Sequence, residues 1–321
     1  MPACSVCIEI SCFFKIKQET KWLFLILSNA KFIYIIFLLM YLTTMEFIKT
    51  ETPIQICDIG ASPIDKTDFI EELLINSNSK LIGFEPNSVE FEKLNQNDPK
   101  RKYYDFGIGD GTEKTLNICK AVGMSSFLEP DMDYLKNFHG FEEWSKILET
   151  VKVKTKKLSD ISDKIDFLKI DVQGYESEII KYGEDKIKDC LVLQIETSPT
   201  PLYKNEKTFS SIILQLENLG FSLHMFNHIN TRSFKPTMIS KNPFIGLHHL
   251  FQLDCVLIKN LKIIDNYNVE ELKKLILILF YSFKSYDLVD YLIRLLDKKN
   301  KQKNIEKFRK IFPKLKMRKI Y

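Results

Sequence analysis

The sequence has no G-x-G-x-x-G stretch, although apolar runs and amphipathic stretches alternate along much of the chain. The turn after the first apolar run has a single glycine, Gly60, and Pro63 follows it. A pyrophosphate is therefore not expected there, because a dinucleotide site uses several glycines to bring the backbone close to it. Internal repeats and low-complexity linkers are also missing, so we predict one catalytic-type domain with a helical C-terminal extension.

Paired cysteine motifs are missing as well. Cys4 and Cys7 form a lone C-x-x-C, without the second pair that is typical of a zinc site. Four other cysteines are scattered, and three of these sit in apolar strand-like runs, so we expect small buried side chains in a reducing compartment. These four are Cys57, Cys119, Cys190 and Cys255.

The N-terminus lacks a complete signal sequence or membrane span. The uninterrupted apolar run, residues 32–42, is too short to cross a bilayer, and no small-x-small cleavage site follows it. Three interpretations stay open: Met45 is the natural start, Trp22–Leu42 is a signal anchor that buries Asn29 and Lys31, or this segment is a packed helix. We expect a cytoplasmic protein, with membrane association through Trp22–Leu42 as the alternative.

Positive charge is concentrated at the C-terminal end. Residues 294–321 contain 12 Lys and Arg against 2 Asp and Glu, a net charge of +10, so the remainder carries −6 of the total +4. Such a tail can contact phosphate or an anionic membrane, but a solvated helical tail explains it equally simply and is the interpretation we favour.

Alternating apolar and amphipathic segments from residue 54 onward predict an α/β fold with a mostly parallel sheet. We expect an apolar N-terminal segment at residues 1–50, a catalytic domain at 51–260 and a helical extension with a basic tail at 261–321. Strands are predicted at 54–58, 80–84, 102–106, 115–119, 151–155, 165–170, 191–196, 221–226 and 251–258. Helices are predicted at 66–75 (with Asp65 as N-cap), 88–96, from 176, at 208–219 and at 269–296.

Acidic and turn residues follow several of these strands, where ligands bind in open α/β sheets. Gly60 lets the chain turn close to a ligand, and the helix N-terminus beyond it can bind a carboxylate. Glu85, 25 residues later, is placed to accept hydrogen bonds from both ribose hydroxyls, which excludes a 2′-phosphate. Asp110, after Gly109, flanks an adenine or closes a hairpin, and both interpretations stay open. A nucleoside and an amino-acid carboxylate without pyrophosphate describe S-adenosylmethionine.

Five ordered motifs over residues 54–260 resemble FkbM-type methyltransferases. They are Asp58-Ile-Gly-Ala-Ser62, Gly83-Phe-Glu-Pro-Asn87, Gly109-Asp-Gly111, Phe167-Leu-Lys-Ile-Asp-Val-Gln-Gly-Tyr-Glu176 and Gln194-Ile-Glu196. The resemblance implies a Rossmann-like class I methyltransferase fold of seven strands with helices on both faces, in which an antiparallel last strand is inserted beside the fifth. It also implies O-methylation, often of sugar hydroxyls in glycans or metabolites. The family often has Asn and a second Gly in its first motif, where this chain has Ser62-Pro63.

The cofactor residues implied in this way lie at the strand ends. They are Asp58, Gly60, Ala61, Ser62, Glu85, Pro86, Asn87, Gly109, Asp110 and Asp171.

A neutral hydroxyl acceptor needs a group that takes its proton. Our candidates are Asp171, Glu196, His139 and His248, with Glu176 either a further candidate or a first-turn acid of its helix. Asp171, Glu196 and a histidine could together hold a divalent metal, although nothing in their spacing demands one. We assign no metal ligand.

Aromatic residues between 127 and 144 are expected to cover the site. Tyr134, Phe138, Phe141 and Trp144 either stack on a sugar face or pack, and packing is expected for at least two of them.

We expect a small-molecule or glycan acceptor and no specific nucleic acid, since no Asn-Pro-Pro-Tyr base-flipping motif is present. A nucleic-acid methyltransferase and a non-catalytic S-adenosylmethionine-binding scaffold are the alternatives. The sequence leaves the oligomeric state open.

Overall fold

The computed structural model describes residues 45–62, 68–94 and 97–311. Two predictions lie outside these residues: the apolar segment 22–42, and Asp65 as the cap of the first helix. No helix of the described residues is long and apolar enough to cross a membrane.

The elements alternate as the sequence pattern predicts. The strands are β1 (Ile54–Ile59), β2 (Ser79–Phe84), β3 (Arg101–Tyr104), β4 (Gly107–Ile108), β5 (Glu113–Cys119), β6 (Ile147–Lys156), β7 (Phe167–Ile170), β8 (Val192–Thr197), β9 (Phe221–Arg232) and β10 (His249–Lys259). The helices are α3 (Asp68–Asn76), α4 (Ser88–Glu92), η1 (Val122–Met124), α5 (Met132–Leu135), α6 (Phe141–Trp144), η2 (Leu158–Asp160), α7 (Glu176–Ile187), α8 (Phe209–Asn218), α9 (Leu261–Ile264), α10 (Val269–Tyr281), α11 (Tyr286–Asn300) and α12 (Asn304–Ile311).

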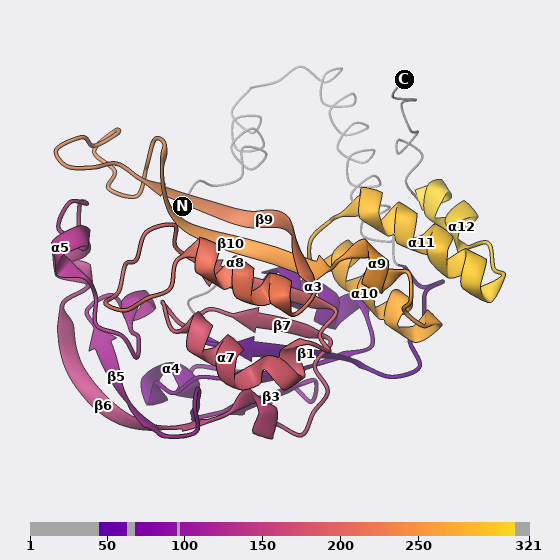
Figure 1. The fold of residues 1–321 in the computed structure, drawn as a ribbon, viewed down its shortest axis with the longest axis horizontal. Coiled ribbons are helices and arrows are strands. Elements are labelled where there is room, and N and C mark those ends of the chain that lie inside the picture. The colour runs from indigo at the N-terminus through magenta and orange to yellow at the C-terminus, as the bar shows by residue number, and fades with distance from the viewer. Residues whose placement is uncertain (1–44, 63–67, 95–96, 312–321) are drawn as a thin grey trace, which may run out of the picture. The chain divides into compact units, whose positions relative to one another are not determined.

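Seven strands form the main sheet, in the order β3-β2-β1-β7-β8-β10-β9 (Figure 1). The first five of these pair in parallel, and β10 runs antiparallel to both β8 and β9. The last strand in the chain is thus inserted beside the fifth strand of the sheet, as predicted. This order confirms the Rossmann-like fold class.

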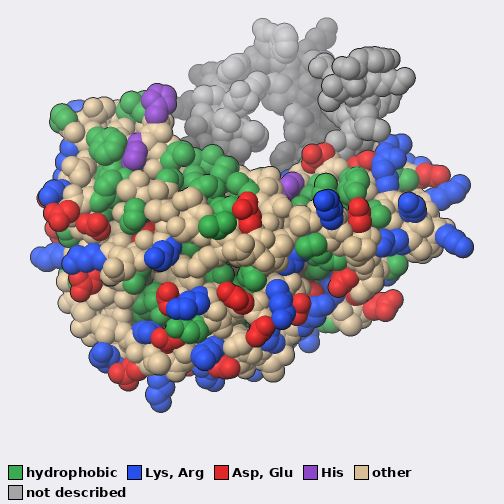
Figure 2. Space-filling view, in the orientation of Figure 1, with side chains coloured by type: hydrophobic (Ala, Val, Ile, Leu, Met, Phe, Trp, Pro, Cys, Tyr) green, Lys and Arg blue, Asp and Glu red, His purple; other side chains and the backbone are tan. Residues whose placement is uncertain are grey.

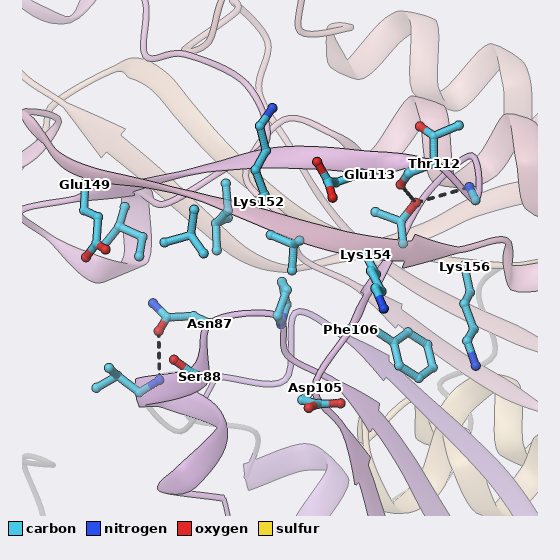
Figure 3. A pocket seen from close by; sticks show the side chains of 18 residues that line it. Asn87, Ser88, Asp105, Phe106, Thr112, Glu113, Glu149, Lys152, Lys154 and Lys156 are labelled. Atoms are coloured by element: carbon cyan, nitrogen blue, oxygen red, sulfur yellow. Dashed lines mark hydrogen bonds between the residues drawn. The ribbon is translucent and has the colours of Figure 1, made fainter.

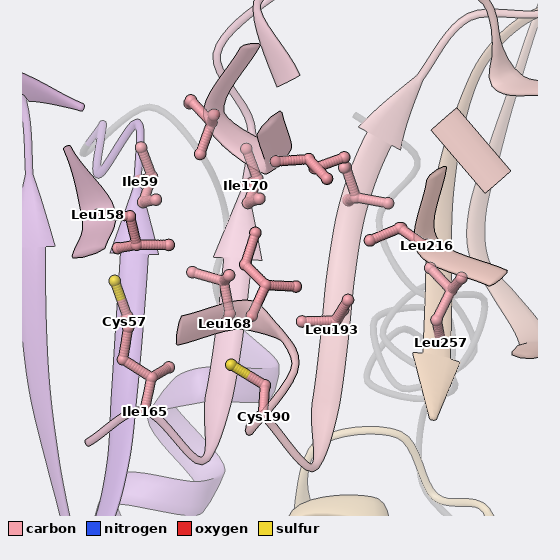
Figure 4. Packing of buried hydrophobic residues seen from close by; sticks show 14 of the residues in the cluster. Cys57, Ile59, Leu158, Ile165, Leu168, Ile170, Cys190, Leu193, Leu216 and Leu257 are labelled. Carbon is pink, nitrogen blue, oxygen red and sulfur yellow. The ribbon is translucent and has the colours of Figure 1, made fainter. Parts of the chain in front are cut away.

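Helices α7 and α8 cover one face of the sheet and build its main hydrophobic core (Figure 4). Strand residues such as Cys57, Leu168 and Leu193 pack there against Ile179 of α7 and Leu216 of α8. All four predicted cysteines are buried with free thiols, which confirms their packing role. The central strands are almost continuously apolar because both of their faces are covered.

The opposite face of the sheet is covered by α3 and α10. Three aromatic rings meet there: Phe69 of α3 lies 6.3 Å from Phe167 of β7 and 5.9 Å from Phe283, which follows α10. The segment at the end of α10 therefore belongs to the layer that packs on the sheet.

A buried ion pair joins α10 to the chain just before β7. Lys274 Nζ donates to a carboxylate oxygen of Asp166 at 2.8 Å and to the carbonyl of Pro53 at 3.0 Å. The same oxygen of Asp166 accepts from the backbone N–H of Gln55 at 2.9 Å. The Asp166 side chain is completely buried and that of Lys274 is 6% exposed. Helix α10 is thus bonded directly to the sheet.

Several predicted elements differ in extent, among them β6, which is longer than predicted, and α4, which is shorter. The helix expected at 269–296 is two helices, α10 and α11, separated by a turn in which Lys284 has a φ of 54°. The apolar spacing continues through this turn, and it contains no Gly or Pro to signal the break. Strands β9 and β10 are several residues longer than predicted, because they continue together as a hairpin past the residues of β10 that pair with β8 (Figure 1).

A second, three-stranded sheet is formed by β4, β6 and β5. The segment between β5 and β6, which was predicted to be irregular, contains the short helices η1, α5 and α6. Its aromatic residues pack mainly on one another. Phe138 and Phe141 are buried with Phe251 of β10, whereas Tyr134 and Trp144 pack at the margin. Packing is therefore the role of at least two of the four predicted aromatic residues.

Candidate functional site

The carboxyl ends of β1, β2, β7 and β8 meet at one edge of the sheet, because these strands are parallel. After β1 the chain turns at Gly60, whose φ is +84°. A Cβ atom at Gly60 would lie 1.9 Å from the backbone oxygen of Asp171, which follows β7. The turns after β1 and β7 therefore touch, and only glycine permits this approach.

The turn after β2 is fixed by its own side chains. The carboxylate of Glu85 accepts from the backbone N–H of Asn87 at 2.7 Å, and Asn87 in turn accepts from the N–H of Val89 and caps α4. Glu85 is 7% exposed, so its carboxylate is held near the strand end in a mostly dry environment.

These turns line one cavity of about 100 Å³. Six predicted cofactor residues are among its walls: Gly60, Ser62, Glu85, Pro86, Asn87 and Asp171. Residues of the segment after β5 close the other side, including Ser126 and Phe127. The structure thus brings together residues that lie more than one hundred positions apart in the sequence.

A larger cavity of about 800 Å³ adjoins the first (Figure 3). The two share Pro86, Asn87 and Leu116 as lining residues. Asp105 and Phe106, which directly follow β3, line this second cavity. Neither was predicted as a site residue, because the sequence pattern extends this strand to residue 106, whereas β3 ends at Tyr104.

Lysines of β6 form another wall of the larger cavity. In Figure 3, Lys154 and Lys156 project from β6 toward Asp105 and Phe106. The ammonium of Lys156 lies 4.4 Å from the centre of the Phe106 ring, a cation–π contact.

Two predicted cofactor residues, Asp58 in β1 and Ala61 in the turn after it, are buried and line neither cavity. Lys169 of β7 donates to Asp58 at 3.1 Å and lies 3.6 Å from a carboxylate oxygen of Asp171. Burial raises the pKa of Asp58, although Lys169 lowers it. Asp58 therefore positions Lys169 and, through it, Asp171.

Gln173 links the ends of β7 and β8. Its side-chain nitrogen donates to Asp171 at 3.0 Å and to Glu196 at 2.5 Å, and its side-chain oxygen accepts from the Tyr203 hydroxyl at 3.2 Å. Its φ of 58° is a left-handed conformation that is uncommon for residues other than glycine. Sequence analysis could not assign this residue, since its contacts involve segments far apart in the chain.

Glu196 is surrounded by other acids. Burial raises the pKa of its carboxyl well above the usual range, and Asp171, Asp254 and Glu176 raise it further. Burial, with a contribution from Asp171, likewise raises the pKa of Asp254 to about 6. Two predicted catalytic residues, Asp171 and Glu196, are therefore brought together in a region with a surplus of carboxyl groups.

The side chain of Glu176 stabilises the turn that precedes its own helix, α7. Its carboxylate accepts from the backbone N–H groups of Val172 and Gly174, which closes the turn that contains Gln173. Burial raises the pKa of Glu176 to about 8. Of the two predicted roles, the contacts favour the first-turn acid.

Neither predicted histidine lines the cavity that contains Asp171. His139 lies between α5 and α6, and its Nε2 atom is buried without a partner. His248 is exposed in the loop that precedes β10. Glu196 does not line this cavity either, but Gln173 links it to Asp171, which does, so Asp171 is the best placed candidate for proton transfer.

Gly109 and Asp110 lie in the turn that leads into β5. Asp110 accepts from the backbone and hydroxyl of Thr112 at 2.9 and 2.7 Å, and from Lys114 at 2.6 Å. Although slight burial raises the pKa of Asp110, these hydrogen bonds lower it to about 2. Neither residue lines the two cavities, so the contacts of Asp110 match the hairpin interpretation.

Within the described ranges, no group of three or more His, Cys, Asp and Glu side chains is arranged to hold a metal ion. The acids at the site are instead bonded to the amide of Gln173, to Lys169 and to backbone N–H groups.

Comparison with known proteins gives one family. A model described as the methyltransferase FkbM domain matches residues 58–223, slightly more than half of the chain. No curated protein matches. A solved methyltransferase FkbM from Methylobacillus flagellatus KT is 14% identical, with 64% of this chain and 43% of that one covered and a TM-score of 0.31. The chain thus spans less than half the length of that protein.

A second solved structure is magnesium protoporphyrin IX methyltransferase from Synechocystis PCC 6803 with bound SAM. It is 11% identical, with 65% of this chain and 71% of that one covered and a TM-score of 0.33.

Proposed function

Because the chain belongs to the FkbM methyltransferase family, we propose that it transfers a methyl group from S-adenosylmethionine to a hydroxyl group of a sugar, glycan or glycosylated metabolite. One observation carries the cofactor assignment: Gly60, Glu85 and Asp171, from three separate strand ends, line a single cavity.

The residues present fit this cofactor. Gly60 leaves no room for a side chain, so the backbone turn itself forms part of the wall. Glu85 is an acceptor for the ribose hydroxyls, and its orientation is set by the bond from Asn87. The adjoining cavity of about 800 Å³ lies within the size range of small-molecule sites and extends past Asp105, which can accept from the adenine amino group.

When bound, S-adenosylmethionine supplies a methyl group on a positively charged sulfur. The chain's own contribution is to hold the acceptor oxygen in line with that group and to receive its proton. Asp171 and Glu196 are our candidates for the proton acceptor, since Gln173 holds both at the end of β7 and β8. A hydroxyl needs such a group because it is a weak nucleophile when protonated.

The acceptor class rests on the family resemblance and on this acidic environment. Carboxylates can accept hydrogen bonds from neighbouring sugar hydroxyls, whereas they repel phosphate groups. A nucleic-acid acceptor is therefore the less favoured alternative, and a non-catalytic cofactor-binding scaffold is the other.

Calorimetric titration of S-adenosylmethionine into the full-length chain tests the cofactor assignment. We expect a Kd on the order of micromolar, weakened by about tenfold or more in Glu85→Ala. Glu92→Ala is the matched control, since Glu92 is the exposed last residue of the neighbouring helix α4. A folded wild-type chain that does not bind the cofactor would contradict the proposal.

The acceptor is tested by transfer of labelled methyl groups to separate glycan, small-glycoside and oligonucleotide fractions. Label in the first two supports the proposal, and label in oligonucleotides alone supports the nucleic-acid alternative. Cofactor binding without label in any fraction supports the scaffold.

A further inference from the structure

The amide group of Gln173 is fixed from both ends. Its nitrogen has two hydrogens, and one points to each of two carboxyl groups, Asp171 and Glu196. Its oxygen accepts from Tyr203, so rotating the amide by half a turn would place an oxygen against two acids. The backbone oxygen of Gln173 also accepts from the Ser126 hydroxyl at 2.7 Å. The nitrogen is therefore a rigid link between the two acids.

The two acids meet at one nitrogen atom in a largely buried place. Burial, and then the neighbouring Asp171, raise the pKa of the Glu196 carboxyl, which favours its protonated form. Lys169 offsets only part of the negative charge here, because its ammonium lies 3.1 Å from Asp58 and 3.6 Å from Asp171 and is shared between them. The charged and titratable groups that face the pair or its partners are Lys169 of β7, Asp58 of β1, Glu176 of α7, Asp254 of β10 with His228 of β9, and Tyr203 and Glu206 of the loop after β8.

We propose that Gln173 holds Asp171 and Glu196 as one pair in which Glu196 carries a proton, and that this proton is released to solvent when a sulfonium cofactor binds. The proposal rests on the proposed function, because it takes S-adenosylmethionine as the ligand. Gln173 is a positioning residue in this scheme, and Glu196 is the carboxyl group whose O–H bond breaks. A positive charge beside the pair favours its second negative charge.

The release prepares the pair for its role in methyl transfer. The acceptor O–H bond breaks and its proton moves to the free carboxylate, while the acceptor oxygen forms a bond to the methyl carbon. The carbon–sulfur bond breaks, and its electrons stay on sulfur as a neutral thioether. The pair then holds one proton again, and the positive charge that opposed this proton is gone. Each turnover thus returns the pair to its starting state.

Proton release on binding can be measured without any acceptor. S-Adenosylmethionine and S-adenosylhomocysteine are titrated calorimetrically into the full-length chain, in phosphate and in Tris at about pH 7, where the two buffers differ in ionisation enthalpy. The two ligands share the same amino and carboxyl groups, but only the first has a charged sulfur. We expect roughly one more proton released with the sulfonium ligand.

Two variants assign this proton. Glu196→Gln should still bind the sulfonium ligand but lose the difference between the two ligands. Gln173→Asn keeps an amide on a residue type that tolerates left-handed backbone, but its side chain is too short to reach both acids. Because two N–H donors to the carboxylates are lost, we expect the midpoint of proton release to move to higher pH by about one unit or more.

The outcomes separate this proposal from the proposed function. Equal proton release with both ligands, or an undiminished difference in Glu196→Gln, would overturn the proposal while leaving the cofactor assignment intact. An unchanged midpoint in a Gln173→Asn chain that binds normally would refute the role of Gln173. Failure of the wild-type chain to bind either ligand would refute both.

Discussion

From the buried ion pair between Asp166 and Lys274 we predict how much the attachment of α10 contributes to the free energy of unfolding. Lys274→Met removes the buried cation and leaves a completely buried carboxylate with one backbone N–H donor and the exposed Lys164 ammonium at 3.9 Å. Breaking one side of a buried ion pair costs about 3–5 kcal/mol. That is a large part of the total free energy of unfolding, about 5–15 kcal/mol for a typical domain. We expect the variant to unfold at a much lower urea concentration.

Urea denaturation of the full-length chain, followed by circular dichroism, measures this effect. Lys273→Met is the matched control. Lys273 is the neighbouring residue on the same helix, and its ion pair with Glu270 is long, at 3.9 Å, and partly exposed. Such a pair contributes about 0.5 kcal/mol or less. The double variant Asp166→Asn with Lys274→Met should regain much of the loss, since no unpaired charge stays buried. A loss below about 1 kcal/mol in Lys274→Met would refute this reasoning.

Three further predictions concern the site. Gly60→Ala should weaken S-adenosylmethionine binding by about tenfold or more in a calorimetric titration, because its Cβ would strike the Asp171 backbone. Gly123 lines the same cavity, but a Cβ added there has no atom within 4 Å, so Gly123→Ala should bind normally. Burial raises the pKa of Glu176 to about 8, above its unfolded value of about 4.3, so the wild-type unfolding free energy should fall as pH rises between these values. Glu176→Gln should make that fall smaller, while Glu196 and Asp254, whose pKa values are also raised, still contribute to it. A slope in Glu176→Gln equal to that of the wild type, from urea unfolding at both ends of the range, would contradict this assignment. Asp110→Ala should lower stability slightly above pH ~4 but keep cofactor affinity within about twofold, and a larger loss of affinity would restore the adenine interpretation.

The candidate residues whose position at the edge of the sheet could be predicted depend on local chemistry. Glu85 and Asp171 were found because an acid directly after a parallel strand lies at the ligand-binding edge, whatever the rest of the chain does. Gly60 was found in the same way. Each of these rules needs only a strand and the few residues that follow it.

The residues that were missed depend on contacts between distant segments. Gln173 is one polar residue in a turn, and its role appears only when Glu196 and Tyr203 are brought beside it. Asp105 was missed because of a two-residue error in the end of β3. The break between α10 and α11 was missed because the apolar pattern favours one continuous helix, and tertiary packing of Phe283 decides otherwise.

The place of β10 in the sheet has a consequence for folding of the chain during its synthesis on the ribosome. β8 is made some fifty residues before β10, and its partner on that side is β10 alone among the described strands. During translation the growing sheet therefore presents an open strand edge, the kind of surface on which nascent chains aggregate or recruit chaperones. β9 is made in between and pairs with β10, so it can dock on the sheet only when the final strand emerges. The edge of the candidate site that carries Glu196, the second-last residue of β8, is thus completed late in synthesis.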